Sequence, residues 1–426
     1  MKIAFYTLGC KVNQYESQAM SEKAAANGYE IASADEEADI YVVNSCTVTA
    51  ESDRKTRQAV RRFKRNHPES IVVLTGCMPQ AFPQDAEHLE QADIVLGNRN
   101  NSKLFELINS YFSCGRRIID IEEHKNGDKF SGGISGFDRR TRAVVKIEDG
   151  CNRFCSYCII PYSRGRVRSK PIAELKEELH KLSEAGFAEV VLVGINLSAY
   201  GTDIGLSICD AVELADSMNF KRVRLGSLEP DHITDEVIKR LSKLQSFCPQ
   251  FHISLQSGCD NTLKAMNRHY SAEEYSELCK KLRANFPDAA ITTDIMVGFP
   301  TESEEDFAEN VRFAQKIGFE KVHVFPYSPR EGTKAAKMPQ IEKSVKEKRS
   351  HIMIEKTEEI RREFLRSQIG KTVDVLFETR HSDGYIEGYT GNYTPVKVKG
   401  ELPCGEILKV KITDVDGDFC VGEKHE

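Results

Sequence analysis

The sequence contains no tryptophan, no long apolar segment and no overall excess of basic residues. No apolar run approaches 18 residues, so we expect neither a membrane-spanning helix nor a membrane partner. The first residues, MKIAFYTLGCKVN, become polar too soon for a signal peptide and indicate a strand. A formal net charge of -6 argues against a uniformly basic nucleic-acid binder, although it permits local basic patches.

Cysteine, in contrast, is plentiful. The chain has 13 cysteines in 426 residues, a length that corresponds to about two to four domains. Thiols spread over so long a chain do not form the dense disulfide framework of a small secreted protein. We therefore expect a reducing, cytoplasmic setting in which several thiolates bind metal.

Three cysteines form a compact motif in the segment EDGCNRFCSYCIIP. Cys151, Cys155 and Cys158 have the spacing C-x3-C-x2-C and directly follow the apolar run 143–147. Thiolates so close together can surround an iron–sulfur cluster or a zinc ion. Structural zinc requires four ligands, but neither Cys nor His occurs between Cys158 and His180. Three ligands on a four-iron cluster leave one iron open, which favours a reactive cluster over zinc or a chance group of buried cysteines.

The N-terminal part alternates strand and helix patterns, which predicts an open parallel α/β sheet. Cys10, Cys46 and Cys77 each follow one of its first three expected strands. Because ligands bind at the carboxyl ends of such strands, we expect these thiolates to converge on a second metal site. The alternative is three ordinary buried cysteines. The expected strands are 2–7, 39–44, 70–75 and 92–96.

Two basic segments lie near these cysteines in the sequence. Residues 54–65, RKTRQAVRRFKR, contain seven basic residues and no acid, and four more basic residues follow the cysteine triplet. Such runs form either a solvated surface or contacts to nucleic-acid phosphates, and for the first run both interpretations stay open. The predicted RNA contacts are Arg54, Lys55, Arg57, Arg61, Arg62, Arg164, Arg166 and Arg168.

A polar, glycine-rich segment, residues 121–141, indicates a linker that follows a first domain of residues 1–120. Residues 142–366 then repeat strand and helix patterns. Six strand–helix units are too few for a closed eight-stranded barrel, so we predict a partial (β/α)6 barrel with a lateral opening. The expected strands are 143–147, 189–193, 222–225, 251–255, 290–295 and 321–325.

The cysteine triplet, with Tyr157 before its last member, resembles the radical S-adenosylmethionine (SAM) superfamily. In that superfamily the amino and carboxylate groups of SAM chelate the open iron. Polar residues follow the barrel strands, at the face where such barrels bind ligands. Each alone also fits a turn or a helix cap, whereas Arg268 suits the carboxylate of SAM. The candidate SAM-binding residues are Tyr157, Gly194, Asn196, Ser227, Glu229, Gln256, Arg268 and Asp294.

Residues 367–426 alternate like short antiparallel strands separated by Asp-Gly turns. A module of this kind predicts a small β-barrel, an architecture often used to bind RNA. It contains seven Lys and Arg against eleven Asp and Glu. Electrostatic attraction alone would therefore not explain RNA binding by this module.

All three predicted domains occur in this order in the methylthiotransferases. TLGCKVNQYES, NSCTVT and TGCMPQ resemble the N-terminal domain of that family, and the tail resembles a TRAM domain. GCNRFCSYCIIPYSRGRVRS, SLQSGCDNTLKAMNR and TDIMVGFPTES resemble the radical-SAM core. LGCKVNQ and CNRFCSYCIIPYSRGR are most similar to the MtaB branch, which modifies N6-threonylcarbamoyladenosine at position 37 of tRNA. The isopentenyladenosine and ribosomal-protein branches typically read GCQMN and GCPKN.

The resemblance implies two [4Fe–4S] clusters and SAM, and no side chain that acts as a catalytic acid or base. One cluster would cleave SAM to a radical that attacks C2 of the adenine, and the other would carry the sulfur. The implied partners are the tRNA anticodon stem-loop, a reductant such as flavodoxin or ferredoxin, and a sulfur donor; we expect a monomer. The implied ligands are Cys151, Cys155 and Cys158 for the first cluster, and Cys10, Cys46 and Cys77 for the second.

Three alternatives stay open at this point. The same chemistry could act on isopentenyladenosine at position 37 of tRNA or on an aspartate of a ribosomal protein. The chain could instead be a non-catalytic iron–sulfur protein that binds RNA or transfers electrons. A zinc protein is the third alternative, which iron and sulfide analysis distinguishes from the other two.

Overall fold

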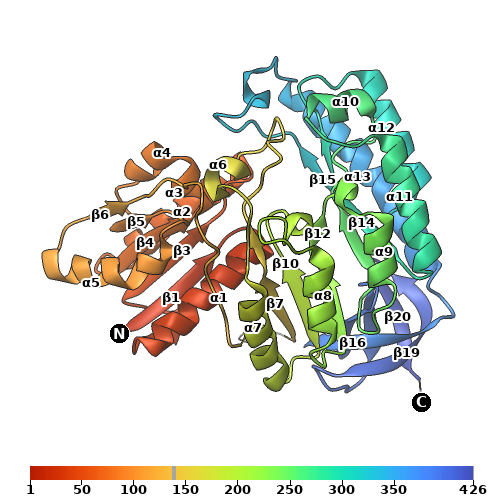
Figure 1. Ribbon diagram of the computed structural model, residues 1–426, viewed down its shortest axis with the longest axis horizontal. Helices are drawn as coiled ribbons and strands as arrows, with labels where there is room; N and C mark the ends of the chain where they lie inside the picture. Colours follow the sequence, from red (N-terminus) through yellow and green to blue (C-terminus); the bar gives the residue numbers. More distant parts are fainter. Residues whose placement is uncertain (137–140, 426) are drawn as a thin grey trace. The chain divides into compact units, whose positions relative to one another are not determined.

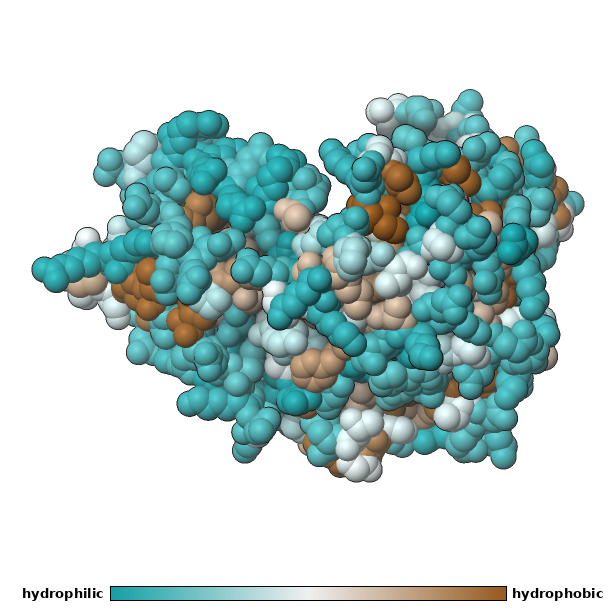
Figure 2. All heavy atoms as spheres, turned by 90° about the horizontal axis from the view of Figure 1, so that it is seen from above, coloured by the Kyte–Doolittle hydropathy of each residue, from teal (hydrophilic) through white to brown (hydrophobic). Residues whose placement is uncertain are grey.

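The computed structural model describes residues 1–136 and 141–425, and the chain forms two compact units (Figure 1). Unit 1 comprises Met1–Ser135, Lys146–Pro171 and Ser328–Lys337, and unit 2 comprises Gly136–Val145, Ile172–Tyr327 and Met338–Glu426. The cysteine triplet thus belongs to the same unit as the N-terminal sheet. Figure 2 shows a mainly hydrophilic surface with small, separate hydrophobic groups. Among the described helices, none has the length and apolar character that a membrane crossing requires.

A parallel sheet with the strand order β2-β1-β3-β4-β5-β6 forms the centre of unit 1. Every residue of β3 and β4 is buried, as expected for strands covered on both faces. The predicted α/β sheet is confirmed, but the three-residue edge strands β2 and β6 were not predicted. The strands are β1 (Lys2–Thr7), β2 (Glu30–Ala32), β3 (Ile40–Ser45), β4 (Ile71–Gly76), β5 (Ile94–Leu96) and β6 (Ile118–Asp120).

Helices cover both faces of this sheet. Met20 and Ile108, from α1 and α5, pack on one face, whereas Val60 and Phe63 of α2 pack on the other. The helix α2 begins at a cap in which the Thr49 side chain accepts a hydrogen bond from the Ser52 amide. The helices are α1 (Lys11–Ala26), α2 (Ala50–Asn66), α3 (Cys77–Ala81), α4 (Pro83–Glu87), the 3-10 turn η1 (Asn101–Lys103) and α5 (Leu104–Cys114).

The segment for which the sequence predicts a linker, residues 121–141, has an irregular backbone as far as it is described. Residues 121–136 contain neither helix nor strand, and residues 137–140 lie outside the described part. Ion pairs fix part of the segment, since Arg99 pairs with Glu122 and lies 2.9 Å from Asp128. Unit 1 is completed by β8 (Glu148–Asp149), α6 (Ile160–Arg164), β9 (Arg168–Ser169) and η4 (Ala335–Lys337).

Unit 2 contains the predicted partial barrel. Its strands form two sheets, β11-β10-β7 and β12-β13-β14-β15, and only Gly226 separates β11 from β12. In the described residues β7 and β15 are unpaired edges, which confirms an open barrel. The strands are β7 (Arg142–Lys146), β10 (Glu189–Val193), β11 (Arg222–Leu225), β12 (Ser227–Leu228), β13 (Gln250–Ile253), β14 (Ala290–Val297) and β15 (Lys321–Pro326).

The helices of unit 2 follow these strands, and α11, α12 and α13 lie side by side (Figure 1). Ser271 and Ser303 begin α11 and α12 with reciprocal capping boxes, a strong local start signal. The helices are α7 (Ile172–Glu184), η2 (Leu197–Ala199), α8 (Ile208–Asp216), η3 (Pro230–His232), α9 (Asp235–Leu241), α10 (Asp260–Ala265), α11 (Ala272–Asn285), α12 (Glu304–Ile317) and α13 (Lys343–Arg366).

The C-terminal residues form a closed five-stranded barrel in the order β16-β17-β18-β20-β19, as predicted. Alternating side chains such as Val375, Phe377 and Val410 fill its interior. The strands are β16 (Thr372–Arg380), β17 (Tyr385–Thr390), β18 (Pro395–Lys399), β19 (Ile407–Asp416) and β20 (Phe419–Lys424).

Buried arginines attach this small barrel to the larger one. Arg222 donates to the carbonyl oxygens of Asp374 and Tyr389 at 2.7 and 2.8 Å. Arg224 donates to Gly391 O at 3.0 Å and pairs with Glu189 at 2.7 Å. Burial would raise the pKa of Glu189, but the surrounding guanidinium groups outweigh it and hold the pKa below its usual range.

Replacement of Glu189 by alanine should therefore destabilise unit 2 strongly. The variant Glu189→Ala leaves buried guanidinium groups without their carboxylate, which should lower the free energy of unfolding by about 3–5 kcal/mol. Urea denaturation at neutral pH measures the change. Glu277→Ala is the matched control, because Glu277 forms an exposed pair with Lys280, and its denaturation midpoint should stay unchanged. Equal midpoints for the two variants would contradict the anchoring role of Glu189.

Candidate metal centre

Three adjacent strands of unit 1 bring Cys10, Cys46 and Cys77 to one edge of the sheet. Cys46 directly follows β3, Cys77 directly follows β4, and Cys10 caps α1 after β1. These strands are neighbours in the order β1-β3-β4, and neighbouring strands lie about 4.8 Å apart. Three thiols that are distant in sequence therefore meet at the carboxyl end of the sheet.

Hydrogen bonds from polar side chains hold the three cysteine loops together. Asn13 Nδ2 donates to the carbonyl oxygens of Leu8 and Ser45, each at 2.9 Å. Ser45 Oγ donates to Thr75 O at 2.6 Å and accepts from the Met78 amide at 3.1 Å. The backbone around all three thiols is thus cross-linked without any metal ligand taking part.

Gly9 shows how tightly the loops are packed. Its φ is +106°, which favours glycine, and a Cβ there would lie 2.7 Å from Cys46 Cβ and 3.0 Å from its Sγ. A side chain at this position would displace Cys46.

Arg164 provides a positive charge next to these thiols. Its Nε lies 3.2 Å from Cys77 Sγ, and the Arg164 side chain is almost completely buried. Burial raises the pKa of the Cys77 thiol to about 12; neighbouring Cys46 and Cys10 add to the rise, and Arg164 opposes it. A thiol must lose its proton to bind metal, so this guanidinium favours the ligand form.

Carboxylates and a lysine surround Arg164 in a buried charge cluster. Arg164 forms a bidentate pair with Glu16, whose second oxygen lies 3.0 Å from the guanidinium. Lys146 lies 2.9 Å from both Glu16 and Asp149, and Arg168 lies 3.2 Å from Asp149. The cluster therefore sets three cationic side chains against two carboxylates, and its excess positive charge lies beside the Cys77 thiol.

This burial corrects the sequence prediction for Arg164 and Arg168 as RNA contacts. Arg168 donates to the carbonyl oxygens of Arg164 and Arg166 at 2.8 and 2.9 Å and is 9% exposed. Side chains engaged in this way do not reach an RNA phosphate; instead they organise the loop that carries the cysteine triplet. Arg166 lies between them in the sequence and is exposed.

Backbone hydrogen bonds shape the loop of Cys151, Cys155 and Cys158. The amide of Cys151 donates to Gly165 O, and that of Cys158 donates to Cys155 O, both at 3.0 Å. Gly150 has a φ of +91°, and a Cβ there would meet Arg166 O at 2.0 Å. The loop is thus folded back on itself, with all three cysteines half-buried. Three thiols on one short turn fit a cluster that keeps one corner open.

The basic helix α2 presents a solvated surface. Arg54, Lys55 and Arg61 are exposed, and Arg54 lies 2.6 Å from Glu51. Arg57 lies 3.7 Å from Asp85, and Arg62 stacks on the rings of Tyr6 and Phe63. These five side chains stay candidate RNA contacts, because each is exposed or half-buried.

Seven of the candidate SAM-binding residues lie in unit 2, and Tyr157 lies in unit 1. Gly194 and Asn196 follow β10, and Ser227 lies in β12. Gln256 has a φ of +67° and exchanges backbone hydrogen bonds with β14 at Asp294 O and Met296 N, both at 2.9 Å. Polar groups thus do gather where the barrel strands end.

Arg268 is engaged by another candidate of the same set. Its guanidinium lies 2.5 Å from Glu229 Oε2 and 3.1 Å from Ser254 O. Asp294 in turn lies 3.3 Å from His252 Nε2. The predicted pairing of Arg268 with a SAM carboxylate would therefore require Glu229 to share this arginine.

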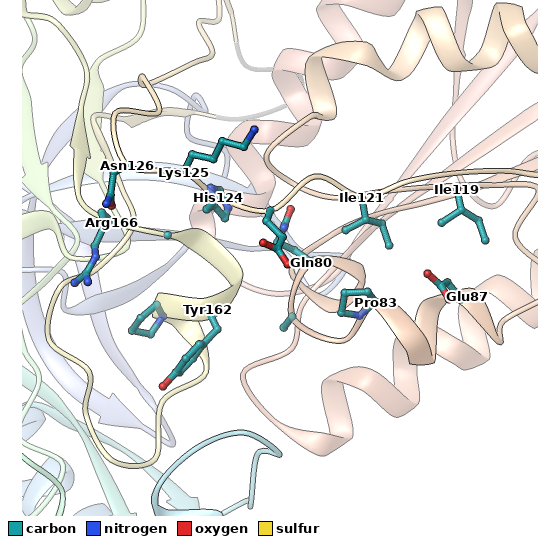
Figure 3. Close-up of a pocket in the computed structure, with 14 residues that line it drawn as sticks. Gln80, Pro83, Glu87, Ile119, Ile121, His124, Lys125, Asn126, Tyr162 and Arg166 are labelled. Carbon is teal, nitrogen blue, oxygen red and sulfur yellow. The ribbon is translucent and has the colours of Figure 1, made fainter.

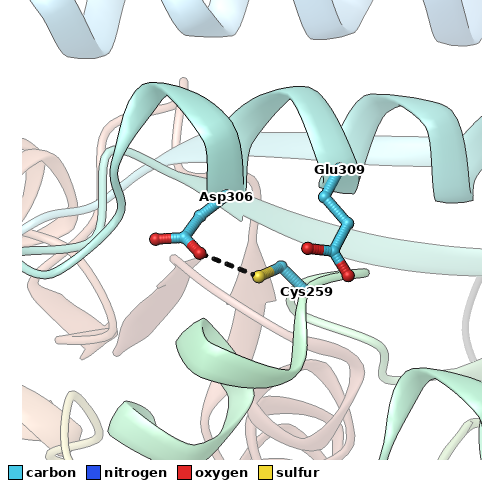
Figure 4. A group of neighbouring side chains, drawn as sticks. All are labelled: Cys259, Asp306 and Glu309. Carbon is cyan, nitrogen blue, oxygen red and sulfur yellow. Dashed lines mark hydrogen bonds between the residues drawn. The ribbon is translucent and has the colours of Figure 1, made fainter.

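A second group with metal-binding side chains lies in unit 2 (Figure 4). Cys259 Sγ donates to Asp306 Oδ1 at 3.1 Å, and Asn261 donates to the same oxygen at 3.1 Å. Asp306 also caps α12 together with Ser303, and Glu309 is exposed. The hydrogen bonds account for Asp306, and we assign this group a structural role.

Sequence reasoning missed Asn13, Glu16 and Asp149. A helical signal was present for the first two, because Cys10, Asn13 and Glu16 recur every three residues at the start of α1 and so share one face. Asp149 stands two residues before Cys151 and gave no separate signal.

The neutral replacement Arg164→Met should destabilise unit 1 by about 3 kcal/mol, because it removes the bidentate partner of the buried Glu16 carboxylate. Burial opposes the ionisation of Glu16 and Asp149, but Arg164 and Lys146 outweigh it and lower both pKa values. Their stabilisation is present above the unfolded carboxylate pKa of about 4 and is lost as the pH falls through the folded values. The gap between wild type and variant should therefore shrink in acid.

Denaturation of the metal-free protein at several pH values measures this effect. Arg166→Met is the control, because Arg166 is exposed, and it should leave the midpoint nearly unchanged. A gap for Arg164→Met that grows in acid would contradict the assigned role.

Comparison with known proteins finds family matches in each part of the chain. Three families match it: "Uncharacterized protein family UPF0004" at residues 2–97, "Radical SAM superfamily" at residues 145–314 and "TRAM domain" at residues 366–424. As a member of the radical SAM superfamily, the chain uses SAM and a [4Fe–4S] cluster. Among solved structures, the radical S-adenosylmethionine methyltransferase TsrM of Kitasatospora setae, with cobalamin and a [4Fe–4S] cluster bound, shares the fold. Its TM-score is 0.55 at 14% identity, with coverage of 77% of this chain and 73% of that chain.

Curated relatives match over nearly the full length. The threonylcarbamoyladenosine tRNA methylthiotransferase MtaB of Aquifex aeolicus is 37% identical, over 97% of this chain and 100% of the relative. MtaB of Bacillus subtilis is 36% identical over 96% and 93%. The tRNA-2-methylthio-N(6)-dimethylallyladenosine synthase of Caldicellulosiruptor saccharolyticus is 34% identical over 98% and 91%. The chain therefore belongs to the radical-SAM tRNA methylthiotransferase family.

Proposed function

We propose that the protein replaces the hydrogen at C2 of N6-threonylcarbamoyladenosine-37 in tRNA with a methylthio group. Relatives that carry this activity in their names are similar over almost the whole chain. The observation that carries the proposal is the pair of cysteine trios within one compact unit.

Each trio would hold one [4Fe–4S] cluster. Cys151, Cys155 and Cys158 hold the cluster that binds SAM, and the three thiols at the sheet edge hold a second cluster. When bound, these groups supply the electron that cleaves SAM and the sulfur that enters the product. Arg164 positions Cys77 and balances thiolate charge, and no side chain needs to act as a catalytic acid or base.

The reaction balances with two molecules of SAM. One is reductively cleaved to methionine and 5′-deoxyadenosine, which carries away the C2 hydrogen, and the other transfers its methyl group to the sulfur and leaves as S-adenosylhomocysteine. Sulfur comes from a sulfur donor, and the electrons come from a reductant such as a flavodoxin or a ferredoxin. The exposed basic residues of α2 and the TRAM-like barrel are the candidate contacts for the anticodon stem-loop, and we propose a monomer.

The reaction and its substrate can be tested together. Anaerobically reconstituted protein, SAM and dithionite are incubated with tRNA that carries either N6-threonylcarbamoyladenosine or isopentenyladenosine at position 37. Mass spectrometry of the nucleosides should find the methylthio product with the first tRNA. Product only with the second would favour the alternative that the dimethylallyladenosine synthases represent, and absence of both product and 5′-deoxyadenosine would favour a non-catalytic protein.

The two trios should be separable by substitution. Alanine at Cys10, Cys46 and Cys77 should lower the iron content from about eight to about four per chain. This variant should still cleave SAM to 5′-deoxyadenosine but should form no methylthio nucleoside. Alanine at the other trio should abolish the cleavage itself. An unchanged iron content in the first variant would contradict the second cluster.

A single methyl group at Gly9 should disturb the second site alone. The Cβ of Gly9→Ala would meet Cys46 at 2.7 Å, so iron bound by the N-terminal trio should fall while SAM cleavage persists. Gly28→Ala is the matched control, because Gly28 has a φ of +83° but no atom within 4 Å of the added Cβ. Equal iron contents in the two variants would show that the close approach of Gly9 is unimportant.

A further inference from the structure

A cavity of about 670 Å³ lies in unit 1, beside the turn that follows the cysteine triplet (Figure 3). Its wall combines α3, α4, the irregular segment after β6, and α6 with the residues that follow it. This volume lies within the range of about 300–1,000 Å³ that is usual for small-ligand sites. The lining residues used below are Tyr162, Arg166, Lys125, Asn126, Glu87 and Glu123.

Tyr162, which lines the cavity, forms an exposed aromatic pair with Phe154. Tyr162 is 54% exposed and Phe154 is 37% exposed, and their rings meet edge to face with centroids 6.0 Å apart. The guanidinium of Arg166 lies 4.7 Å from the centre of the Phe154 ring. Aromatic rings and arginine planes that remain accessible in this way form the surfaces on which unpaired bases stack.

The backbone of Phe154 supports a functional role for its exposure. Its φ is +51°, a left-handed conformation that is rare for a bulky residue. Such strain of about 1–3 kcal/mol persists where the surrounding structure enforces it, often at functional sites. Here the strained backbone holds an apolar ring at the surface, between two cysteines of the triplet. An exposed ring contributes little to the free energy of folding.

The charges along the cavity are complementary to a nucleotide rather than to a simple anion. Arg166, Asn126 and Lys125 lie toward one end of the cavity, and Glu87 lies toward the other end (Figure 3). The cationic end suits a phosphate. Carboxylates such as Glu87 and Glu123 would repel a second phosphate but can accept hydrogen bonds from the amino groups of a base or the hydroxyls of a ribose.

We propose that this surface binds an unpaired nucleotide of the tRNA anticodon loop, next to the adenosine that is modified. Its base stacks on the ring of Tyr162, which Phe154 supports edge to face, and Arg166 contacts its phosphate. The proposal rests on the proposed function, because that function supplies the RNA. It also provides a basis for loop recognition that the acidic C-terminal module, with seven Lys and Arg against eleven Asp and Glu, does not provide by charge.

Binding of a fluorescein-labelled anticodon stem-loop with N6-threonylcarbamoyladenosine tests the proposal by fluorescence anisotropy. Tyr162→Ala should weaken binding by about 5- to 100-fold, the usual effect of losing one stacked base, whereas Tyr162→Phe should bind like the wild type. Arg166→Ala should weaken binding and reduce the slope of log affinity against log salt by about 1. Tyr162→Ala should leave that slope unchanged, because stacking involves no counterion release.

Phe112→Ala is the matched control, since Phe112 is 49% exposed in the same unit and does not line the cavity; it should bind normally. A duplex of the same stem without the loop provides the second control. Stacking needs an unpaired base, so wild type and Tyr162→Ala should bind the duplex equally. Iron content and circular dichroism confirm that Tyr162→Ala is folded and loaded, and Arg166→Ala serves as the surface variant if it is not.

Equal affinity of wild type and Tyr162→Ala for the stem-loop would overturn the proposal, as would an equal loss on loop and duplex. These outcomes leave the proposed function intact, because the nucleoside product of the wild-type protein tests it separately. Conversely, binding that depends on Tyr162 without any methylthio product would contradict the function while supporting the nucleotide site.

Discussion

The buried guanidinium of Arg164 is the interaction on which the arrangement of unit 1 depends. An uncompensated charge in a protein interior costs several kcal/mol, so Arg164 is stable only where Glu16 and Asp149 meet it. Its Nε also reaches Cys77 Sγ at 3.2 Å. One side chain thus connects α1, the residue that follows β4, and the turn after the cysteine triplet.

This constraint explains why the two cysteine trios share a compact unit. The triplet lies in a segment of the radical SAM match, residues 145–314, whereas the other trio lies in the match that covers residues 2–97. Lys146 and Arg164 belong to the first segment and Glu16 belongs to the second, and the ion pairs between them help to join the two. The buried arginines after the triplet, Arg164 and Arg168, therefore help to build the candidate metal centre, and only Arg166 among the three arginines faces solvent.

Unit 2 uses the same physical device for a different purpose. Arg222 and Arg224 extend from β11 to backbone carbonyl groups of the small C-terminal barrel, and Glu189 compensates their charge. The module is acidic, and its attachment combines these buried hydrogen bonds with ion pairs such as Arg142–Glu378, whose charged groups lie 2.8 Å apart. In the proposed function, RNA recognition combines the barrel with exposed groups elsewhere, and Tyr162 is the most accessible aromatic near the cysteine triplet.

The sequence by itself determined the elements whose signal is local. The continuous apolar runs predicted β3 and β4, and the alternation of strands and helices predicted the open barrel. Three cysteines within eight residues predicted a metal site. Only the tertiary structure decided that Arg164 is buried and ion-paired. Within a run of basic residues, the sequence does not distinguish a buried arginine from a surface arginine until its partners are known. Those partners, Glu16 and Asp149, come from different segments, and burial depends on contacts that no sequence window contains. The edge strands β2 and β6 were not predicted for a related reason. Three residues are too few to show a strand pattern, and they pair only when a neighbouring strand is present.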